Sequence, residues 1–231
     1  MPARIGIYRG MTDTFFTCDA GVVLIGGGVV DPADLAIARA LAPALVAADG
    51  GGDRALALGA VPERVIGDLD SLSETARARL GARVIRVAEQ ESTDFGKCLS
   101  HVAAPFYICL GFAGLRLDHT LAALSELARR PRQPAFLIAE DEVVFRLPDA
   151  LDLNLPVGER VSLFPFGPVR ARSTGLRWPL DGIDFAPAGR VGTSNEVSGP
   201  TVSIHVETGD ALLLLPKRYL PLALRAVTRS R

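Results

Sequence analysis

Short apolar runs alternate with segments of helical periodicity between Val22 and about Leu147. The runs that predict strands are Val22–Gly26, Ala44–Ala48, Arg64–Gly67, Arg83–Val87, Phe106–Gly111 and Ala135–Ala139. The segments rich in Ala, Leu and Arg predict helices over roughly Pro32–Leu41, Asp53–Leu58, Ser73–Leu80, Asp94–Ala103 and His119–Arg130. This alternation is typical of βαβ units, so it indicates a parallel sheet covered by helices.

The pattern changes after about Phe145, where Pro and Gly become frequent and the helical periodicity ends. Thr201 to Glu207 alternates apolar and polar residues, as a half-buried strand does. Val161–Phe166 and Ala211–Leu215 predict further strands separated by turn residues. We therefore expect an α/β domain over residues 1–145 and a small antiparallel β-sandwich domain over residues 146–231.

Composition excludes several classes of protein. The 231 residues are 48% apolar and 22% charged, which disfavours a disordered chain. The 25 basic residues do not exceed the 26 acidic ones, so we expect no nucleic-acid partner. Apolar runs fall short of the roughly 20 residues needed to cross a bilayer, so we expect no membrane association. The three cysteines fit no disulfide framework, and we expect a reducing cytoplasm.

The clearest candidate for chemistry is the segment VIGDLDS, from Val65 to Ser71. It ends a predicted strand with Asp68 and Asp70, two residues apart. Two carboxylates on such a turn can reach one hard cation, and Mg²⁺ prefers oxygen ligands while keeping coordination positions for phosphate. The alternative is that both aspartates only form Asx turns and cap the next helix.

The same arrangement recurs at other strand ends. The aspartates at predicted strand-to-helix junctions are Asp49, Asp68, Asp70, Asp94 and Asp118. Crowded carboxylates repel one another and raise their own pKa values, so a divalent cation is a natural counterion. Lys97 and Arg116 would suit phosphate oxygens, and Thr93 or Ser92 could cap the helix that carries Lys97.

Each of these residues also has an ordinary structural interpretation. Asp49 alone is typical of a turn, Lys97 of a solvated helix face, and Arg116 with Asp118 of a surface ion pair of small energy. The triple glycine at 26–28 lacks the spacing of a phosphate-binding loop and predicts only a tight turn.

Six motifs occur together in a fixed order. They are ADGG (48–51), GDLDS (67–71), QxxTDFxK (90–97), RxDH (116–119), GLxWPL (175–180) and TSNE (193–196). This set resembles the thiamine pyrophosphokinase family over about residues 22 to 215. The resemblance implies transfer of the pyrophosphoryl group of ATP to the thiamine hydroxyl, which gives thiamine diphosphate and AMP. It also implies a homodimer with the site between subunits, an ATP-binding catalytic domain and a β-sandwich that binds thiamine.

The resemblance assigns roles to residues motif by motif. Those implied to hold Mg²⁺ are Asp68, Asp70 and Asp94. Those implied on the ATP side are Asp49, Gly50, Gly51, Lys97, Arg116, Asp118 and His119. Those implied to contact thiamine are Gln90, Thr93, Trp178, Ser194 and Asn195. Either Asp94 or Asp118 would accept the hydroxyl proton. The chain departs from the family pattern at Glu89, where the family has aspartate, and at Leu115 in the ATP-side loop.

Two other functions remain open from the residues alone. The first is a Mg²⁺-dependent phosphohydrolase in which Asp68 is the nucleophile. The second is a non-catalytic sensor that binds nucleotide or thiamine. Trp178, which we expect to stack on the cationic thiamine, has its own alternative as an apolar plug in a core or an interface.

Overall fold

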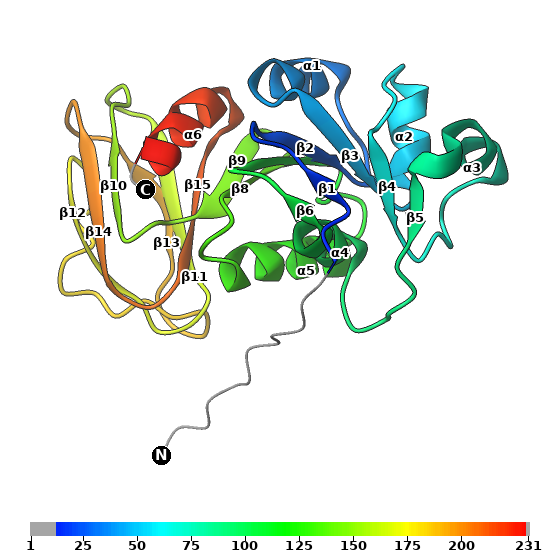
Figure 1. The fold of residues 1–231 in the computed structure, drawn as a ribbon. Helices are drawn as coiled ribbons and strands as arrows, with labels where there is room; N and C mark the ends of the chain where they lie inside the picture. The colour runs from blue at the N-terminus through cyan, green and yellow to red at the C-terminus, as the bar shows by residue number, and fades with distance from the viewer. Residues whose placement is uncertain (1–12, 230–231) are drawn as a thin grey trace.

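Six parallel strands from the N-terminal part of the sequence form one side of the main sheet (Figure 1). The computed structural model describes residues 13–229. The parallel strands are β2 (Val22–Ile25), β3 (Ala44–Ala48), β4 (Arg64–Gly67), β5 (Val84–Arg86), β7 (Tyr107–Leu110) and β8 (Ala135–Ala139). The central strand β2 pairs with both β3 and β7, so that Val22 lies beside Ala44 and Tyr107.

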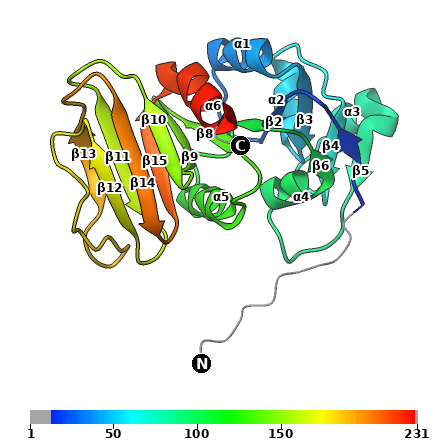
Figure 2. The same cartoon turned by 60° about the vertical axis from the view of Figure 1, so that its left-hand side comes forward.

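The main sheet continues without a break into the C-terminal half. The added antiparallel strands are β9 (Glu142–Arg146), β15 (Ala211–Pro216), β11 (Arg160–Pro165) and β13 (Gly192–Glu196). The complete strand order is β13-β11-β15-β9-β8-β7-β2-β3-β4-β5. A second sheet consists of β10 (Ala150–Leu153), β14 (Val202–Thr208) and β12 (Arg170–Thr174) and faces this end of the main sheet (Figure 2).

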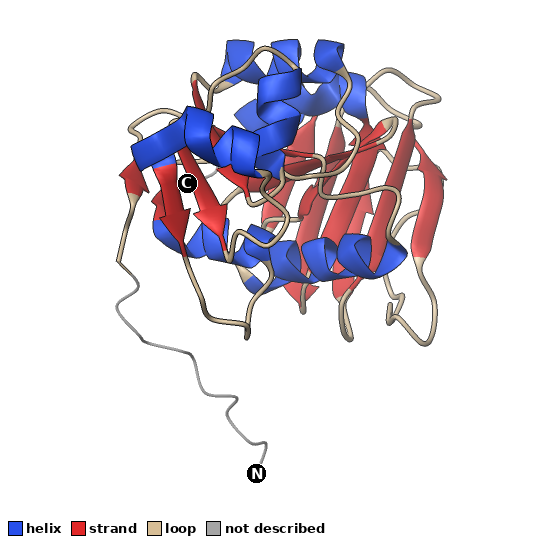
Figure 3. Ribbon diagram, turned by 90° about the vertical axis from the view of Figure 1, so that its right-hand side faces the viewer, coloured by secondary structure: helices blue, strands red, loops and turns tan. Residues whose placement is uncertain are grey.

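Helices cover both faces of the parallel part of the sheet (Figure 3). They are α1 (Pro32–Leu41), α2 (Gly51–Ala57), α3 (Glu74–Leu80), α4 (Asp94–His101), α5 (Leu117–Arg129) and α6 (Leu220–Arg229). Alternate residues of each strand point to opposite faces. Val23 and Ile25 therefore pack with α1, α2, α3 and α6, whereas Val22 and Leu24 pack with α4 and α5.

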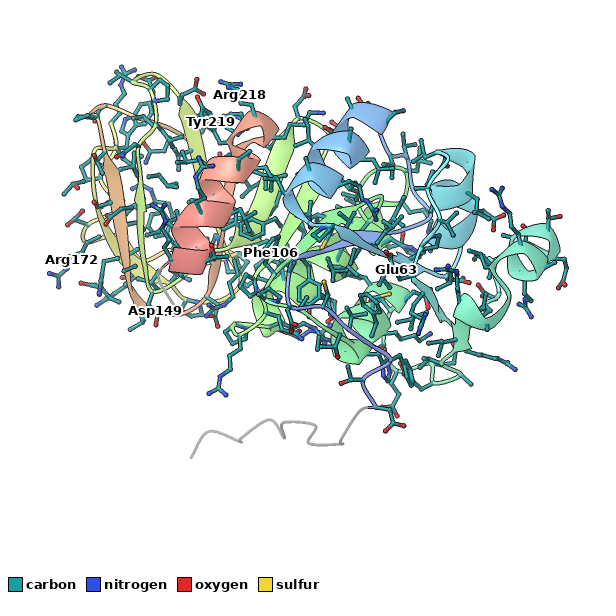
Figure 4. The ribbon with its side chains drawn as sticks, turned by 45° about the horizontal axis from the view of Figure 1, so that its top comes forward. Glu63, Phe106, Asp149, Arg172, Arg218 and Tyr219 are labelled. Carbon is teal, nitrogen blue, oxygen red and sulfur yellow. The ribbon has the colours of Figure 1, made fainter. Side chains whose placement is uncertain are left out.

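The C-terminal helix α6 joins the two halves of the molecule. It contacts β10, and its buried residues belong to the same apolar cluster as α1 and the sandwich core. The 3-10 turn Lys217–Tyr219 precedes it. Figure 4 shows Arg218 and Tyr219 beside the start of α6, where the Arg218 guanidinium lies 4.9 Å from the centre of the Tyr219 ring and also pairs with Glu159.

The predicted fold class is confirmed, with a parallel α/β part followed by an antiparallel sandwich. Helix α2 begins at Gly51 instead of Asp53. Gly51 packs so closely on β2 that a Cβ would lie 2.1 Å from the Ile25 carbonyl oxygen, so the first turn of the helix requires glycine there. The periodicity also missed α6 and the short pair of strands β1 (Phe16–Thr17) and β6 (Val102–Ala103).

Two further observations concern the helices and the thiols. Within residues 13–229, no helix combines the length and apolar character needed to span a bilayer.

Cys98 and Cys109 are buried, Cys18 is half-buried, and all three are free thiols. Burial raises the pKa of the Cys98 thiol, which therefore behaves as an apolar core residue.

Candidate active site

A cavity of about 590 Å³ opens where the central parallel strands end. Strands β2, β3, β4 and β7 all run in the same direction, so the turns that follow them meet at one edge of the sheet. The predicted site residues that line this cavity are Asp49, Gly50, Asp68, Gln90, Thr93, Asp94, Lys97, Arg116 and His119.

Three carboxylates form the centre of this cavity. Asp49 follows β3, Asp68 follows β4 and Asp94 is the first residue of α4. One carboxylate oxygen of each lies within 4.8 Å of the others. Such a spacing allows all three groups to share one cation. The family resemblance implies Asp68, Asp70 and Asp94 as the ligands, whereas the group in the structure contains Asp49 in place of Asp70.

The backbone at this centre is strained. Asp49 and Leu69 have positive φ angles of 45° and 71°, a conformation that non-glycine residues adopt only where the surrounding structure holds them. Gly67 makes the approach of the two turns possible, because a Cβ there would lie 2.8 Å from the Asp49 Cβ. The glycine before Asp68 thus has a packing role beside the carboxylates.

Asp49 is the carboxylate of this group that is most buried and whose pKa is raised. Its side chain is 3% exposed. Its Oδ2 accepts a hydrogen bond from the Ser71 N–H at 3.0 Å, whereas its Oδ1 is buried and has no partner among the described residues. Burial, together with the neighbouring Asp70 and Asp94, raises the pKa of Asp49 to about 6. An unpartnered buried carboxylate oxygen beside two further carboxylates fits a divalent cation.

Lys97 supplies the positive charge within the cluster. It lies one turn after Asp94 on α4, is 2% exposed, and its Nζ lies 3.0 Å from Asp94 Oδ1 and 3.7 Å from Asp68 Oδ2. Burial lowers the pKa of Lys97, but the hydrogen bond and the negative charges of Asp94 and Asp68 outweigh it, so the net pKa is raised. Lys97 is therefore a buried cation and not a solvated residue.

The segment before α4 holds Asp68 in place. Gln90 Nε2 donates a hydrogen bond of 2.9 Å to Asp68 Oδ2, and this bond lowers the pKa of Asp68. The Glu89 carboxylate accepts hydrogen bonds from the N–H groups of Glu91 and Ser92. The longer side chain at position 89 therefore closes the loop that presents Gln90.

Thr93 is the residue that caps α4. Its Oγ1 accepts a hydrogen bond from the Gly96 N–H at 3.1 Å. The Ser92 hydroxyl bonds Glu89 instead, which decides between the two cap residues that the sequence allows. The cap fixes the first turn of α4 and with it the direction of Asp94.

Arg116, Asp118 and His119 lie at the start of α5, at the rim of the cavity. Arg116 and Asp118 form a 2.5 Å ion pair in which both side chains are exposed. The pair lowers the pKa of Asp118. Asp118 is absent from the cavity lining and from the carboxylate group among residues 13–229. The structure thus brings Asp118 to Arg116 and not to the other four aspartates.

Other expected site residues lie apart from the cavity lining. Asp70 is exposed, neighbours Asp49 and accepts a hydrogen bond from the Ser71 hydroxyl, and Gly51 is buried under β2. Trp178, Ser194 and Asn195 lie together in the sandwich, where Asn195 hydrogen-bonds the backbone of Trp178. Trp178 is 50% exposed, and Ser194 has a strained φ of 60°.

The cavity also has a glycine-rich wall that the motif analysis did not assign to the site. Its residues are Gly26, Gly27, Gly28, Gly111, Phe112, Ala113 and Gly114, and it continues into Leu115 of the expected ATP-side loop. They come from the turns after β2 and β7, two neighbouring parallel strands. These glycines directly follow central parallel strands in the sequence, and this position could have indicated that they line the site.

Comparison with known families gives the same division of the chain. The profile of the thiamin pyrophosphokinase catalytic domain matches residues 39–137, and that of the thiamin pyrophosphokinase vitamin B1 binding domain matches residues 149–213. The chain belongs to the thiamin pyrophosphokinase family. The carboxylate group lies within the segment matched by the catalytic-domain profile, whereas Trp178 and Asn195 lie within the segment matched by the binding-domain profile.

Individual members of the thiamin pyrophosphokinase family agree with this assignment. Thiamine pyrophosphokinase 1 from rice is 29% identical, and the match covers 62% of this chain and 62% of the rice protein, so it spans about three fifths of that relative. The solved structure of thiamin pyrophosphokinase from Candida albicans superposes with a TM-score of 0.74 at 18% identity, covering 94% and 96% of the two chains. The Bacillus subtilis structure gives 0.71 at 21% identity, covering 85% and 98%. The structural likenesses establish a shared fold.

The raised pKa of Asp49 makes the stability of the metal-free protein depend on pH. Its folded pKa of about 6 lies above the ordinary 3.8, so its contribution is greatest below about pH 4 and is lost as pH rises through 6. The two-unit difference corresponds to about 3 kcal/mol of unfolding free energy. Urea unfolding of the Asp49→Asn variant in the presence of a chelator should not show this loss of stability between about pH 4 and 6. An equal pH dependence of the unfolding free energy in the variant and the wild type would contradict the role of Asp49.

Proposed function

We propose that this protein is a thiamine pyrophosphokinase that transfers the pyrophosphoryl group of ATP to the hydroxyl of thiamine. One observation carries the proposal: Asp49, Asp68 and Asp94 converge with the buried Lys97 in one cavity of a chain of this family. Phosphoryl transfer depends on positioning and on neutralising charge at the phosphate oxygens. Clustered carboxylates with one cation suit a metal–nucleotide substrate.

We propose that Asp68 and Asp94 hold Mg²⁺, with Asp49 as a third ligand in the same group. The bound ion would neutralise the negative charge of the transferred phosphates. Gln90 would keep Asp68 oriented through its 2.9 Å hydrogen bond. Asp70, which the family resemblance also assigns to the ion, borders the group from the side of Asp49.

The chain's own cations would bind the phosphates. Lys97 is held rigidly on α4 between Asp94 and Asp68, whereas Arg116 is exposed at the rim with His119. Arg116 would exchange its ion pair with Asp118 for a bidentate contact with phosphate. Asp94 lines the cavity and Asp118 does not, which supports Asp94 as acceptor of the thiamine hydroxyl proton.

We propose a homodimer in which thiamine lies between two chains. The sandwich residues Trp178 and Asn195 lie near β13, which is seven strands from β3 in the sheet order. At about 4.8 Å per strand this is about 34 Å, too far for one thiamine to touch both sites within a chain. Exposed Leu117 and Leu121 on α5 and Phe164 on β11 supply apolar surface for such an interface.

We further propose residues 1–145 as the ATP-binding catalytic domain, residues 146–231 as the thiamine-binding domain, and a reducing cytoplasmic location. The change from parallel to antiparallel pairing after β8 supports the boundary near Arg146. The three free thiols suit a reducing compartment.

One assay tests the activity against its alternatives. The protein is incubated with ATP, Mg²⁺ and thiamine, and AMP and thiamine diphosphate are quantified by chromatography. We expect equal amounts of both products, formed only when thiamine is present. Phosphate release that does not depend on thiamine would indicate the phosphohydrolase with Asp68 as nucleophile, and ligand binding without products would indicate the sensor.

Trp178→Ala is expected to raise the thiamine KM about 2- to 30-fold, the range of one cation–π contact, with little change in the KM for ATP.

A mixture of Trp178→Ala and Asp68→Asn chains, unfolded and refolded together, tests whether each active site is shared between two chains. Heterodimers would contain one intact site. At equal ratios, and at thiamine concentrations well below the wild-type KM, the mixture should therefore reach about a quarter of wild-type activity in addition to the residual activity of the Trp178→Ala sites. No recovery, with heterodimers verified by native mass spectrometry, would refute a site shared between chains.

A further inference from the structure

The turn Gly26–Gly28 lines the cavity, yet neither the motifs nor the proposed chemistry uses it. Hydrogen bonds fix this turn to the end of β7. The Gly26 N–H donates to the Leu110 carbonyl oxygen at 2.8 Å, and the Gly28 N–H donates to the Gly111 carbonyl oxygen at 3.0 Å. The position of Gly27 between two anchored residues is therefore well defined.

Packing explains two of the three glycines but not the third. A Cβ on Gly26 would lie 2.6 Å from the Gly111 carbonyl oxygen, and one on Gly28 would lie 2.7 Å from the same atom. A Cβ on Gly27 would make only ordinary contacts, the nearest at 3.6 Å. The φ angle of Gly27 also lies outside the left-handed region. The fold therefore tolerates alanine at position 27.

The free space at Gly27 belongs to the active-site cavity. Gly27 is exposed and lines this cavity, and a Cβ at this position would lie nearest to backbone atoms of Gly50 and Gly51. Gly50 directly follows the buried Asp49. Among the described residues, no acceptor bonds the N–H groups of Gly27 and Gly50. Two backbone N–H groups without an acceptor among the described residues thus line the cavity next to Asp49.

We propose that Gly27 is a polyphosphate-binding position for the nucleotide, because its missing side chain lets the polyphosphate chain lie against the backbone of Gly50. This inference rests on the proposed function. A phosphate chain is thin, anionic and satisfied by backbone N–H groups. The atoms nearest to a Cβ at position 27 are backbone atoms of Gly50 and Gly51, which suits a phosphate chain.

The test compares Gly27→Ala with a matched glycine outside the cavity. Gly189→Ala is the control, because its Cβ would also have its nearest contact at 3.6 Å, with Ala186 in the sandwich. Both variants should keep the wild-type unfolding temperature. Gly27→Ala should weaken binding of Mg²⁺-ATP at least tenfold by calorimetry, and of Mg²⁺-tripolyphosphate by the same factor, while Gly189→Ala changes neither.

Each other outcome overturns the inference. Unchanged ATP affinity in Gly27→Ala would show that the position does not contact the nucleotide. Weaker ATP binding with unchanged tripolyphosphate binding would place the base or ribose at Gly27 and refute the polyphosphate assignment. A lowered unfolding temperature would show that the glycine serves packing. Because binding is measured without turnover, absence of thiamine diphosphate formation by the wild type would refute the proposed function alone.

Discussion

Asp68→Asn is expected to reduce turnover by more than about 100-fold, since even residues that only support metal ligands cost 10- to 100-fold when removed. Asp68 shares the carboxylate group with Asp49 and Asp94 and accepts the hydrogen bond of Gln90. Asparagine keeps its size but removes one negative charge. Initial rates of AMP formation and calorimetric titration with Mg²⁺ and ATP would measure the effect.

Two further asparagine variants make this result specific. Asp184→Asn breaks an exposed ion pair with Arg170 and should leave turnover unchanged. Asp70→Asn should retain more activity than Asp68→Asn, because Asp70 lies outside the group of three oxygens among the described residues. An Asp68→Asn protein with wild-type rates and Mg²⁺ affinity would remove Asp68 from the metal site.

Lys97→Met should reduce turnover about 100-fold or more, the cost of removing one fixed donor from developing phosphate charge. It should also destabilise the metal-free protein by about 2 kcal/mol, less than for a fully buried pair because Asp94 is one-third exposed. The cause is that Asp94 and Asp68 lose their only close cation among the described residues. Denaturant unfolding and initial rates would measure both effects.

Lys217→Met is the matched control for this variant. Lys217 Nζ also lies 3.0 Å from a carboxylate, that of Asp34, but at 32% exposure and outside the cavity lining. Its loss should cost less than about 1 kcal/mol and leave turnover unchanged. Equal effects of the two substitutions on turnover would show that Lys97 acts only as a structural ion pair.

Local sequence signals were sufficient for the parallel half of the molecule and for the centre of its site. Asp49, Asp68 and Asp94 each follow a strand or begin a helix, and parallel order brings those ends together without further information. The same rule failed for Asp118. Its orientation depends on the glycine-bearing turn 111–114, whose path no periodicity encodes, and Arg116 holds it at the surface.

Long-range pairing was beyond the sequence signals. Strand β9 connects the parallel strands to β15, which follows it by more than sixty residues, and this pairing extends one sheet across both halves. Hydrophobic alternation in the sequence predicts that such strands exist but does not determine which strands pair with each other in the sheet. The glycine wall was missed for a related reason, since clearance around Gly27 exists only in three dimensions.

The unbroken sheet constrains how the molecule can move. Ladder hydrogen bonds run from β13 to β5, and one apolar cluster spans α1, the sandwich and α6. A hinge between the two halves would have to disrupt both, so this arrangement opposes closure by rotation of one half against the other. We therefore expect conformational adjustment to substrates in rim segments such as residues 112–116.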